Sequence, residues 1–549
     1  MIKGAEIAME AETLEKKSKR RYWYFLIALT VAGFLMRLLG CFWGMPLLLH
    51  PDEPATVDYA MEMLSRHSWM AQSFDRPDHF EIKCDAILFA VFSRLYYHQP
   101  AYVAFETHAH SFYLVARFFS ALFGTALIPL TMLFAQELLE KQPKCLGRMA
   151  GACVGCGVGF LPIFIRYSTL ANPDVVLCFF VVLFTWMLRR YLVYGKDKYI
   201  YFGALIIGIC VTIKYNGAIL CLPLALAVVY RSLRNKKPVD ILRLGAFSVL
   251  LVVCAIFLIA PNLFLDYQAV ISNVLREARP EHLGADGLSF TGNLRFYLTD
   301  FLNAFGTETW VLLLWGLVCV LRMKDEGLKC LLTGAIYWGC MSVLKLHWSR
   351  WGIPVYPFFM LLIGIGLGDL YSRARAMPKG GKAVSAVVLV FTAGVLVNSF
   401  VFGLSDTKHL TVPDSRQLAL QDFEVLGITA ENSIYEGYTP FDPAGYTDKT
   451  DAFCLTDGEI TVAPAYADKT YFIMSNSFSG RYAAEPERYA QKNAIYAAIA
   501  QHYPVVYTRG PDGNRSSSKW ILPNILDCLD YLTAKVTCSG SPITVYKLQ

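Results

Sequence analysis

Long apolar runs dominate the chain and leave few folds open to it. Runs of roughly 20 mostly apolar residues, the length that crosses a bilayer as a helix, recur between residues 22 and 403. Lipid offers no hydrogen-bond partner to an exposed backbone, so repeated runs of this kind predict a bundle of membrane-spanning helices. The composition agrees, because 55% of the 549 residues are hydrophobic, which is too apolar for an ordinary soluble enzyme.

The basic residues give these spans a direction. Residues 1–21 end in a basic cluster, and the positive-inside rule therefore predicts a cytoplasmic N-terminus. If the chain crosses about eleven times, every strongly basic short loop falls on that same side. The scatter of basic residues over short loops also argues against nucleic-acid binding. The predicted spans are residues 22–43, 111–136, 149–165, 175–190, 199–213, 218–230, 240–264, 310–321, 330–344, 352–371 and 383–403.

Residues 404–549, called the tail below, differ in kind from residues 22–403. They are polar and rich in Pro, Gly, Ser and Asp, which predicts a small α/β domain outside the membrane, opposite the N-terminus. A disulfide between Cys528 and Cys538 would require that extracytoplasmic location, and the sequence leaves the pairing open. The predicted strands are Thr470–Met474, Val505–Thr508 and Thr544–Leu548, and the predicted helices are Ser415–Leu426 and Tyr489–His502.

The loop between the first two spans, residues 44–110, carries two predicted amphipathic helices. They cover Ala55–Arg66 and Asp85–Tyr97, and both suit the bilayer surface. Pro54 fits the first turn of the first helix. Directly before it, Asp52 and Glu53 place two adjacent carboxylates where the chain leaves the membrane.

Polar residues of several kinds gather at the outer ends of the predicted spans. The topology rests on lysine and arginine alone, yet it brings acids, bases and histidines to one level. Polar groups at membrane level are costly, so this concentration predicts a functional site. Acids beside bases suit a reaction that deprotonates one partner and stabilises an anion on the other. The residues are Asp52, Glu53, Asp78, His79, Lys83, Arg166, Asp174, Lys214, Arg279, His282, Lys345, His347 and Arg350.

Four short segments share a resemblance to one family. His50-Pro51-Asp52-Glu53 resembles the acidic pair of the polyprenyl-phosphate-sugar-dependent glycosyltransferases with the GT-C fold. These include the dolichyl-phosphate-mannose protein mannosyltransferases and the lipid A aminoarabinose transferase. Asn172-Pro173-Asp174 is similar to the second acidic position of the family, and Lys214-Tyr215-Asn216-Gly217 to its lysine-aromatic-glycine stretch. Arg350-Trp351-Gly352-Ile353-Pro354-Val355-Tyr356-Pro357 resembles its arginine-aromatic helix start.

The order of these segments matches the family over about residues 20–405. The resemblance implies a GT-C-like bundle in a cell membrane, with a sugar on a polyprenyl phosphate as the donor. It implies inversion at the sugar and an acceptor hydroxyl on the outer face, borne by a protein, a lipid or a cell-wall glycan. The tail is more loosely similar to the extracytoplasmic domains of bacterial members, which implies a bacterial source.

The resemblance also implies roles for individual residues. Asp52 would be the general base, and Glu53 would orient Asp52 or the acceptor. A sugar or a cation would be held by Asp174 and His79. Whether a divalent metal cation takes part stays open, since carboxylates with one histidine are a loose ligand set. The donor phosphate would be bound by Lys345, Arg350, Lys214 and Arg279.

Structural explanations exist for the same residues. Asp52, Glu53 and Asp174 could each cap the helix that follows them. Lys214 could be a lysine that extends to the membrane surface, and Arg350 an anchor at that surface. For the whole protein, the alternatives are a transporter or flippase of lipid-linked sugar and a non-catalytic membrane scaffold. A transporter usually carries its polar residues near the bilayer midplane, whereas here they lie at the outer ends.

Overall fold

Each predicted apolar run is helical in the computed structural model, which describes residues 2–70, 78–279, 282–283, 287–456, 458–513 and 518–549. Within these residues, six helical segments are long and apolar enough to cross a membrane, or up to seven with one bent pair. This confirms the α-helical multi-pass membrane fold. The six are α1 (Ile2–Gly40), α4 (Ala101–Leu138), α7 (Pro173–Tyr194), η1 with α9 (Tyr215–Leu220 and Cys221–Arg234), α10 (Val239–Ile259) and α17 (Gly381–Thr411).

The other predicted spans correspond to helices that are shorter or carry more charge. The helix α5 packs against α16, and Gly364 of α16 lies directly on the backbone of Ala150. Such small residues allow close approach of helices without a hydrophobic driving force between them. About eleven helices therefore build the bundle, although length and hydropathy mark only some as spans. These shorter helices are α5 (Lys144–Phe160), α8 (Lys198–Ile213), α14 (Trp310–Arg322), α15 (Leu332–Val343) and α16 (Tyr356–Ala376).

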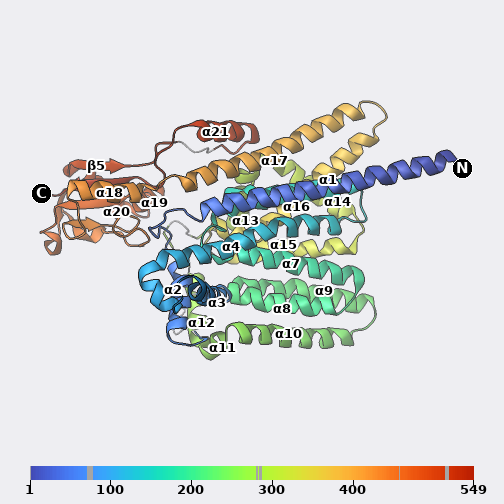
Figure 1. The fold of residues 1–549 in the computed structure, drawn as a ribbon, viewed down its shortest axis with the longest axis horizontal. Coiled ribbons are helices and arrows are strands. Elements are labelled where there is room, and N and C mark those ends of the chain that lie inside the picture. The colour runs from blue at the N-terminus through green and yellow to red at the C-terminus, as the bar shows by residue number, and fades with distance from the viewer. Residues whose placement is uncertain (1, 71–77, 280–281, 284–286, 457, 514–517) are drawn as a thin grey trace.

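The bundle helices run side by side along the long axis of the molecule (Figure 1). The N-terminus projects from one end of the bundle, and the tail packs against the other end, called the tail side below. Short helices lie on this tail side, where Figure 1 labels α2, α3, α11 and α12. They are α2 (Pro54–Ser65), α3 (His79–Tyr96), α6 (Pro162–Arg166), α11 (Asn262–Leu265), α12 (Tyr267–Glu277) and α13 (Phe290–Phe305).

The two amphipathic helices predicted after the first span are α2 and α3. They pack with the start of α4 around a small apolar core that includes Val57, Phe89 and Phe112. The helix α13 was not predicted, because its apolar residues alternate with polar ones and the sequence indicated only a long outer segment. It runs into α14 through a bend of 118°.

The tail contains a four-stranded sheet of order β1-β4-β6-β5. The pair β1–β4 is parallel and the other two pairs are antiparallel. Helices α18 (Ser415–Leu426), α19 (Asn476–Ala484) and α20 (Ala490–His502) accompany it. The predicted strands and helices coincide with β4, β5, β6, α18 and α20. The strands are β1 (Ser433–Tyr435), β4 (Tyr471–Ser475), β5 (Val505–Arg509) and β6 (Ile543–Lys547), beside a hairpin of β2 (Phe453–Thr456) and β3 (Glu459–Val462).

The junction between bundle and tail is continuous. The predicted boundary at residue 404 falls inside α17, which continues to Thr411 without a break. A later segment of the tail, α21 (Ile521–Thr533), returns to pack along α17. Cys528 and Cys538 are both free thiols, and Cys528 lies against Ser405 of α17 at 3.5 Å.

Candidate functional site

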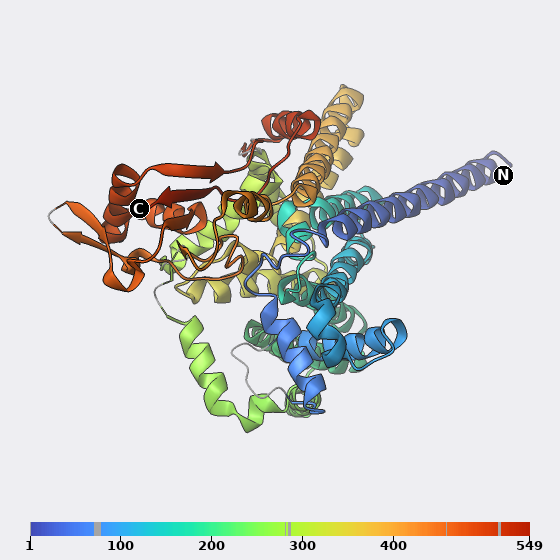
Figure 2. The ribbon, with the colours of Figure 1, turned by 60° about the vertical axis from the view of Figure 1, so that its left-hand side comes forward.

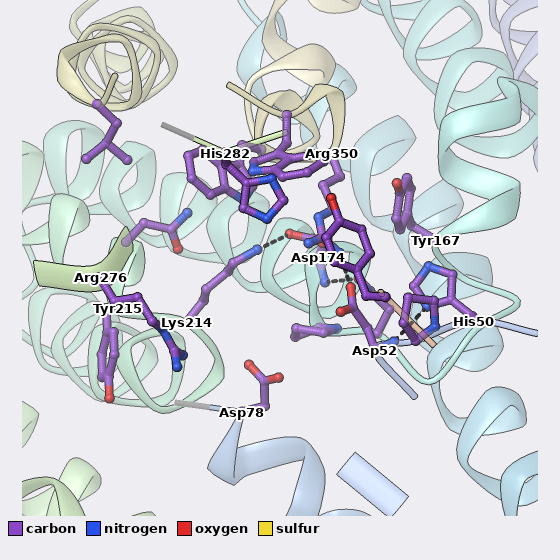
Figure 3. Close-up of a pocket in the computed structure, with 18 of the residues that line it drawn as sticks. His50, Asp52, Asp78, Tyr167, Asp174, Lys214, Tyr215, Arg276, His282 and Arg350 are labelled. Atoms are coloured by element: carbon purple, nitrogen blue, oxygen red, sulfur yellow. Dashed lines mark hydrogen bonds and ion pairs between the residues drawn. The ribbon is translucent and has the colours of Figure 1, made fainter. Parts of the chain in front are cut away.

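A cavity of about 1080 Å³ lies where the tail meets the bundle. Its walls come from segments far apart in the sequence: the loop after α1, the start of α7, the turn between α8 and η1, the helix α12, the short helix η4 (Ser349–Gly352) and the tail. Figure 3 shows the charged side chains of these segments directed toward one another. The predicted site residues that line the cavity are Asp52, Asp78, Asp174, Lys214, Arg279, His282 and Arg350.

Four of these residues form one alternating chain of charges. Arg350 donates a hydrogen bond from Nη1 to Oδ2 of Asp52, and its Nε lies 4.0 Å from Oδ2 of Asp174. Lys214 donates from Nζ to the other oxygen of Asp174 at 2.7 Å. Burial alone would lower the pKa of Arg350, but the carboxylates of Asp52 and then Asp174 raise it overall. Arg350 is thus held charged, and both Arg350 and Lys214 are paired with acids.

The start of α7 positions the Asp174 side chain within this chain of charges. Asn172 is the cap of α7, and its Oδ1 accepts a hydrogen bond from the backbone N–H of Asp174 at 3.0 Å. Pro173 occupies the first turn, where its missing N–H costs nothing. Because Asn172 caps the helix, the Asp174 carboxylate is available to Lys214 rather than to the backbone.

Glu53 has a different environment from its neighbour Asp52. Glu53 occupies the cap position of α2 but makes no side-chain capping bond. Its side chain is fully buried and accepts two hydrogen bonds of 2.7 Å from Arg117 of α4. It also accepts from the backbone N–H of Ala171 at 3.1 Å. Glu53 therefore ties the Asp52 loop to α4 and to the segment that leads into Asp174, and it does not line the cavity.

His50 supports the same loop. Its Nδ1 lies 3.2 Å from the backbone N–H of Asp52, which donates to it. Burial lowers the pKa of His50, although Asp52 and Glu53 raise it. A neutral imidazole that accepts this hydrogen bond fixes the backbone directly before the Asp52 side chain.

Several predicted residues lie outside the cavity lining: Lys83, Arg166 and His347, as well as Lys345 and His79. Lys345 is exposed and lies outside the cavity lining, because the chain between α15 and η4 turns its side chain away, while its carbonyl accepts from Leu288 at 3.2 Å. His79 is buried in the first turn of α3, and its neighbour Asp78 lines the cavity instead. The structure places Arg279 directly after α12, partly exposed at the cavity wall.

The tail supplies a wall of the cavity that sequence analysis did not foresee. Arg481 of α19 donates from Nη1 to the hydroxyl of Tyr446 at 2.7 Å and stacks on that ring. His282 lies between the rings of Tyr446 and Trp348, at 5.8 and 5.0 Å. Trp348 in turn stacks with Arg350 at 5.6 Å. A row of cations and rings therefore connects the charged chain to the tail.

The donor set argues against a metal in this cavity. Throughout the described part of the chain, no three His, Cys, Asp or Glu side chains converge as a cation would require. Asp52 and Asp174 are each occupied by a cationic side chain. Two carboxylates that share an arginine do not fit a divalent ion, so no catalytic step is derived from one.

Two kinds of site residue escaped the sequence analysis. Arg117 gave a signal, because an arginine inside an apolar run is costly and calls for a buried partner. Tyr446 and Arg481 gave none, since they lie in a polar tail, 232 and 267 residues after Lys214, with no motif around them.

Comparison with known proteins agrees with this geometry. Residues 110–265 match the family described as dolichyl-phosphate-mannose-protein mannosyltransferase. No curated protein matches the chain by sequence. The crystal structure of ArnT from Cupriavidus metallidurans in the apo state has a TM-score of 0.50 and 13% identity, over 97% of this chain and 98% of that one. The Archaeoglobus fulgidus oligosaccharyltransferase in the apo form also has a TM-score of 0.50 and 13% identity, over 88% of this chain and 73% of that one.

At this identity the two structures establish the fold, and the matched segment of residues 110–265 adds the relationship by sequence. The chain is therefore a multi-pass membrane protein with the fold of these two structures, and its residues 110–265 are similar in sequence to the dolichyl-phosphate-mannose-protein mannosyltransferase family.

Proposed function

We propose that this protein is an inverting glycosyltransferase that moves a sugar from a polyprenyl-phosphate donor to an acceptor hydroxyl. One observation carries the proposal: Asp52, Arg350, Asp174 and Lys214 form a single charged chain in a cavity at the membrane edge. The reaction needs a base for the acceptor and cations for the departing phosphate, and this chain contains both. The N-terminus is cytoplasmic in this proposal, and the cavity and the tail lie on the opposite face.

Asp52 is the general base. The acceptor hydroxyl gives its proton to the Asp52 carboxylate while its oxygen attacks the anomeric carbon of the sugar. The bond between that carbon and the phosphate oxygen breaks on the opposite face, so the sugar inverts. Polyprenyl phosphate leaves as a phosphate monoester, which needs cations rather than a protonating acid.

Arg350 and Lys214 are the cations that receive this phosphate. Without a donor both are neutralised by Asp52 and Asp174. A bound phosphate competes with the carboxylates for the guanidinium, since arginine binds phosphate oxygens through a rigid fork of N–H donors. When Arg350 turns to the phosphate, Asp52 loses its cationic partner and becomes a stronger base. Binding of the donor phosphate would thus activate the base.

The test measures release of polyprenyl phosphate by the purified protein in nanodiscs, with a panel of polyprenyl-phosphate sugars and candidate acceptors. Asp52→Asn is expected to lower kcat by a factor of roughly 10²–10⁴, because it removes a general base. The matched control is Asp58→Asn: Asp58 lies in α2, accepts from Tyr113 at 3.0 Å and is outside the cavity lining.

The outcomes separate the alternatives. Sugar transfer that fails in Asp52→Asn and survives in Asp58→Asn supports the proposed base. Equal turnover in wild type and Asp52→Asn, or no release with any donor, contradicts it and favours a transporter or a scaffold. Because no metal ligands converge among the described residues, transfer is expected to persist in the presence of a chelator.

A further inference from the structure

The helix α21 of the tail has two contrasting faces. Ile521, Asn524, Cys528 and Tyr531 are buried and face α17. The opposite side exposes large apolar side chains near the start of the helix. These are Trp520, Leu522 and Leu526, with exposed fractions of 55%, 65% and 54%. An exposed stripe of neighbouring large apolar side chains calls for an occupant.

Contacts with α17 fix the depth of this stripe. Asn524 donates to Asn398 at 2.8 Å, Ser405 donates to Cys528 at 3.5 Å, and Lys408 donates to the carbonyl of Tyr531 at 2.9 Å. The partners advance together along both helices, so α21 runs parallel to α17. Asn398 lies within the span predicted for residues 383–403. The first turns of α21 therefore lie beside membrane-spanning helix.

The start of α21 is tied to the bundle. The backbone N–H of Ile521 donates to the carboxylate of Glu308 at 3.1 Å, and Thr307 donates to the carbonyl of Lys519 at 2.9 Å. Both partners lie at the bend between α13 and α14. Glu308 thus satisfies an N–H group that the first turn of a helix leaves unpaired. These bonds hold α21 at a fixed height against the bundle. Figures 1 and 2 both show α21, in red, beside α17.

The positions of the charged residues on α21 agree with this depth. Its exposed acids, Asp527 and Asp530, lie in the second half of the helix, level with Ser405 and Lys408 beyond the predicted span. At the depth of Leu522 and Leu526, α17 also exposes apolar side chains, among them Val397 and Phe400. At a bilayer surface, apolar side chains are expected to lie deep and carboxylates shallow.

We propose that α21 inserts its Trp520–Leu526 face into the tail-side leaflet of the bilayer and anchors the tail to the membrane. The occupant of the exposed stripe is lipid acyl chains. Trp520 lies directly before the first turn, at the deep end of this face, and adds a large apolar ring to it. This anchor does not depend on glycosyl transfer.

Photocrosslinking in nanodiscs of phosphatidylcholine tests the occupant directly. A diazirine amino acid replaces Leu526, and lipid adducts of the intact protein are measured by mass spectrometry. The positive control is the same replacement of Val390, which is 72% exposed on α17 within its predicted span. The negative control replaces Val425, which is 87% exposed on α18. Leu526 is expected to give lipid adducts at a yield close to that at Val390, and about tenfold above that at Val425.

Two results would overturn the anchor. Reaction at Leu526 with water alone, as at Val425, would place the stripe in solvent. A covalent dimer would show that a second copy of the chain covers it.

A second measurement needs no photoreactive residue. Trp520→Phe is expected to remove a fluorescence component that brominated phosphatidylcholine quenches and aqueous iodide does not. The reverse pattern of quenching would contradict the anchor even if the diazirine variants failed to fold.

Discussion

Arg117 holds Glu53 through two hydrogen bonds of 2.7 Å, and neither side chain is exposed. The same guanidinium donates to the carbonyls of Cys41 and Trp43, at 2.8 and 2.7 Å. Arg117 therefore gathers both ends of the loop that carries Asp52. The two neighbouring carboxylates therefore differ in role: Asp52 faces the cavity, and Glu53 fixes the loop.

Glu53→Gln is expected to destabilise the protein more than Asp52→Asn does. It leaves the Arg117 charge buried without its partner, and breaking such a pair costs about 3–5 kcal/mol. The measurement is thermal unfolding of the full chain in nanodiscs. The exposed pair of Arg66 and Glu62 is the control, since its loss costs about 0–1 kcal/mol. Equal unfolding temperatures for Glu53→Gln and wild type would contradict a structural role for the pair.

Arg350→Lys is expected to lose most of the activity although it keeps the charge. A lysine cannot reach Asp52, Asp174 and a phosphate with one planar group, so kcat/KM for the donor should fall by roughly 10²-fold. Affinity for free polyprenyl phosphate should fall as well, and a direct binding titration measures this. The comparison is Arg66→Lys on α2, where no loss is expected. Full activity in Arg350→Lys would remove the phosphate role from Arg350.

Arg481→Ala and Tyr446→Phe test the wall that the tail contributes. We expect KM for the acceptor to rise several-fold, with a smaller change in release of polyprenyl phosphate to water, because neither side chain belongs to the charged chain of Asp52, Arg350, Asp174 and Lys214. Arg488→Ala is the matched control in the same part of the tail, since Arg488 pairs with Glu485 outside the cavity lining. A change in donor release with no change in acceptor KM would assign the wall to the donor.

The buried Glu436 is expected to make the stability of the tail depend on pH. Burial raises the pKa of Glu436 from 4.5 to about 7, while Tyr496 and the backbone N–H of Ser475 donate to it. Between these values the unfolded chain has released the proton and the folded chain keeps it. The unfolding free energy therefore falls as the pH rises from 4.5 to 7, by up to about 3 kcal/mol, and stays level above.

Thermal unfolding at pH 5 and pH 7.5 measures this contribution. Glu436→Gln should unfold at temperatures that change less between the two pH values than those of wild type. Glu424→Gln, at an exposed position of α18, should follow wild type. Parallel behaviour of wild type and Glu436→Gln would contradict the raised pKa.

The sequence predicted the part of the site that depends on charge at membrane ends. Asp52, Asp174, Lys214 and Arg350 were identified because each is polar where an apolar span stops, and the structure brings them into one chain. Lys345 met the same criterion and lies elsewhere. Nothing in a pattern of hydropathy distinguishes which way a side chain at a span end turns.

The parts that escaped prediction depend on tertiary contacts. The pairing of Arg117 with Glu53 joins residues 64 positions apart, and only folding shows which buried acid receives the arginine. The helix α13 packs against α15 and mixes polar with apolar residues, so no long apolar run marks it in the sequence. The wall formed by Tyr446 and Arg481 arises because the tail folds back onto the bundle, and no local signal in the tail reports that contact.

The uninterrupted course of α17 into the tail has a mechanical consequence. A helix of 31 residues is about 46 Å long and bends little, so it acts as a stiff strut with no hinge at the membrane surface. Arg166 braces it from the side through hydrogen bonds to Asp406 of 2.7 and 3.0 Å. The tail therefore cannot swing aside to admit a substrate while α17 stays whole.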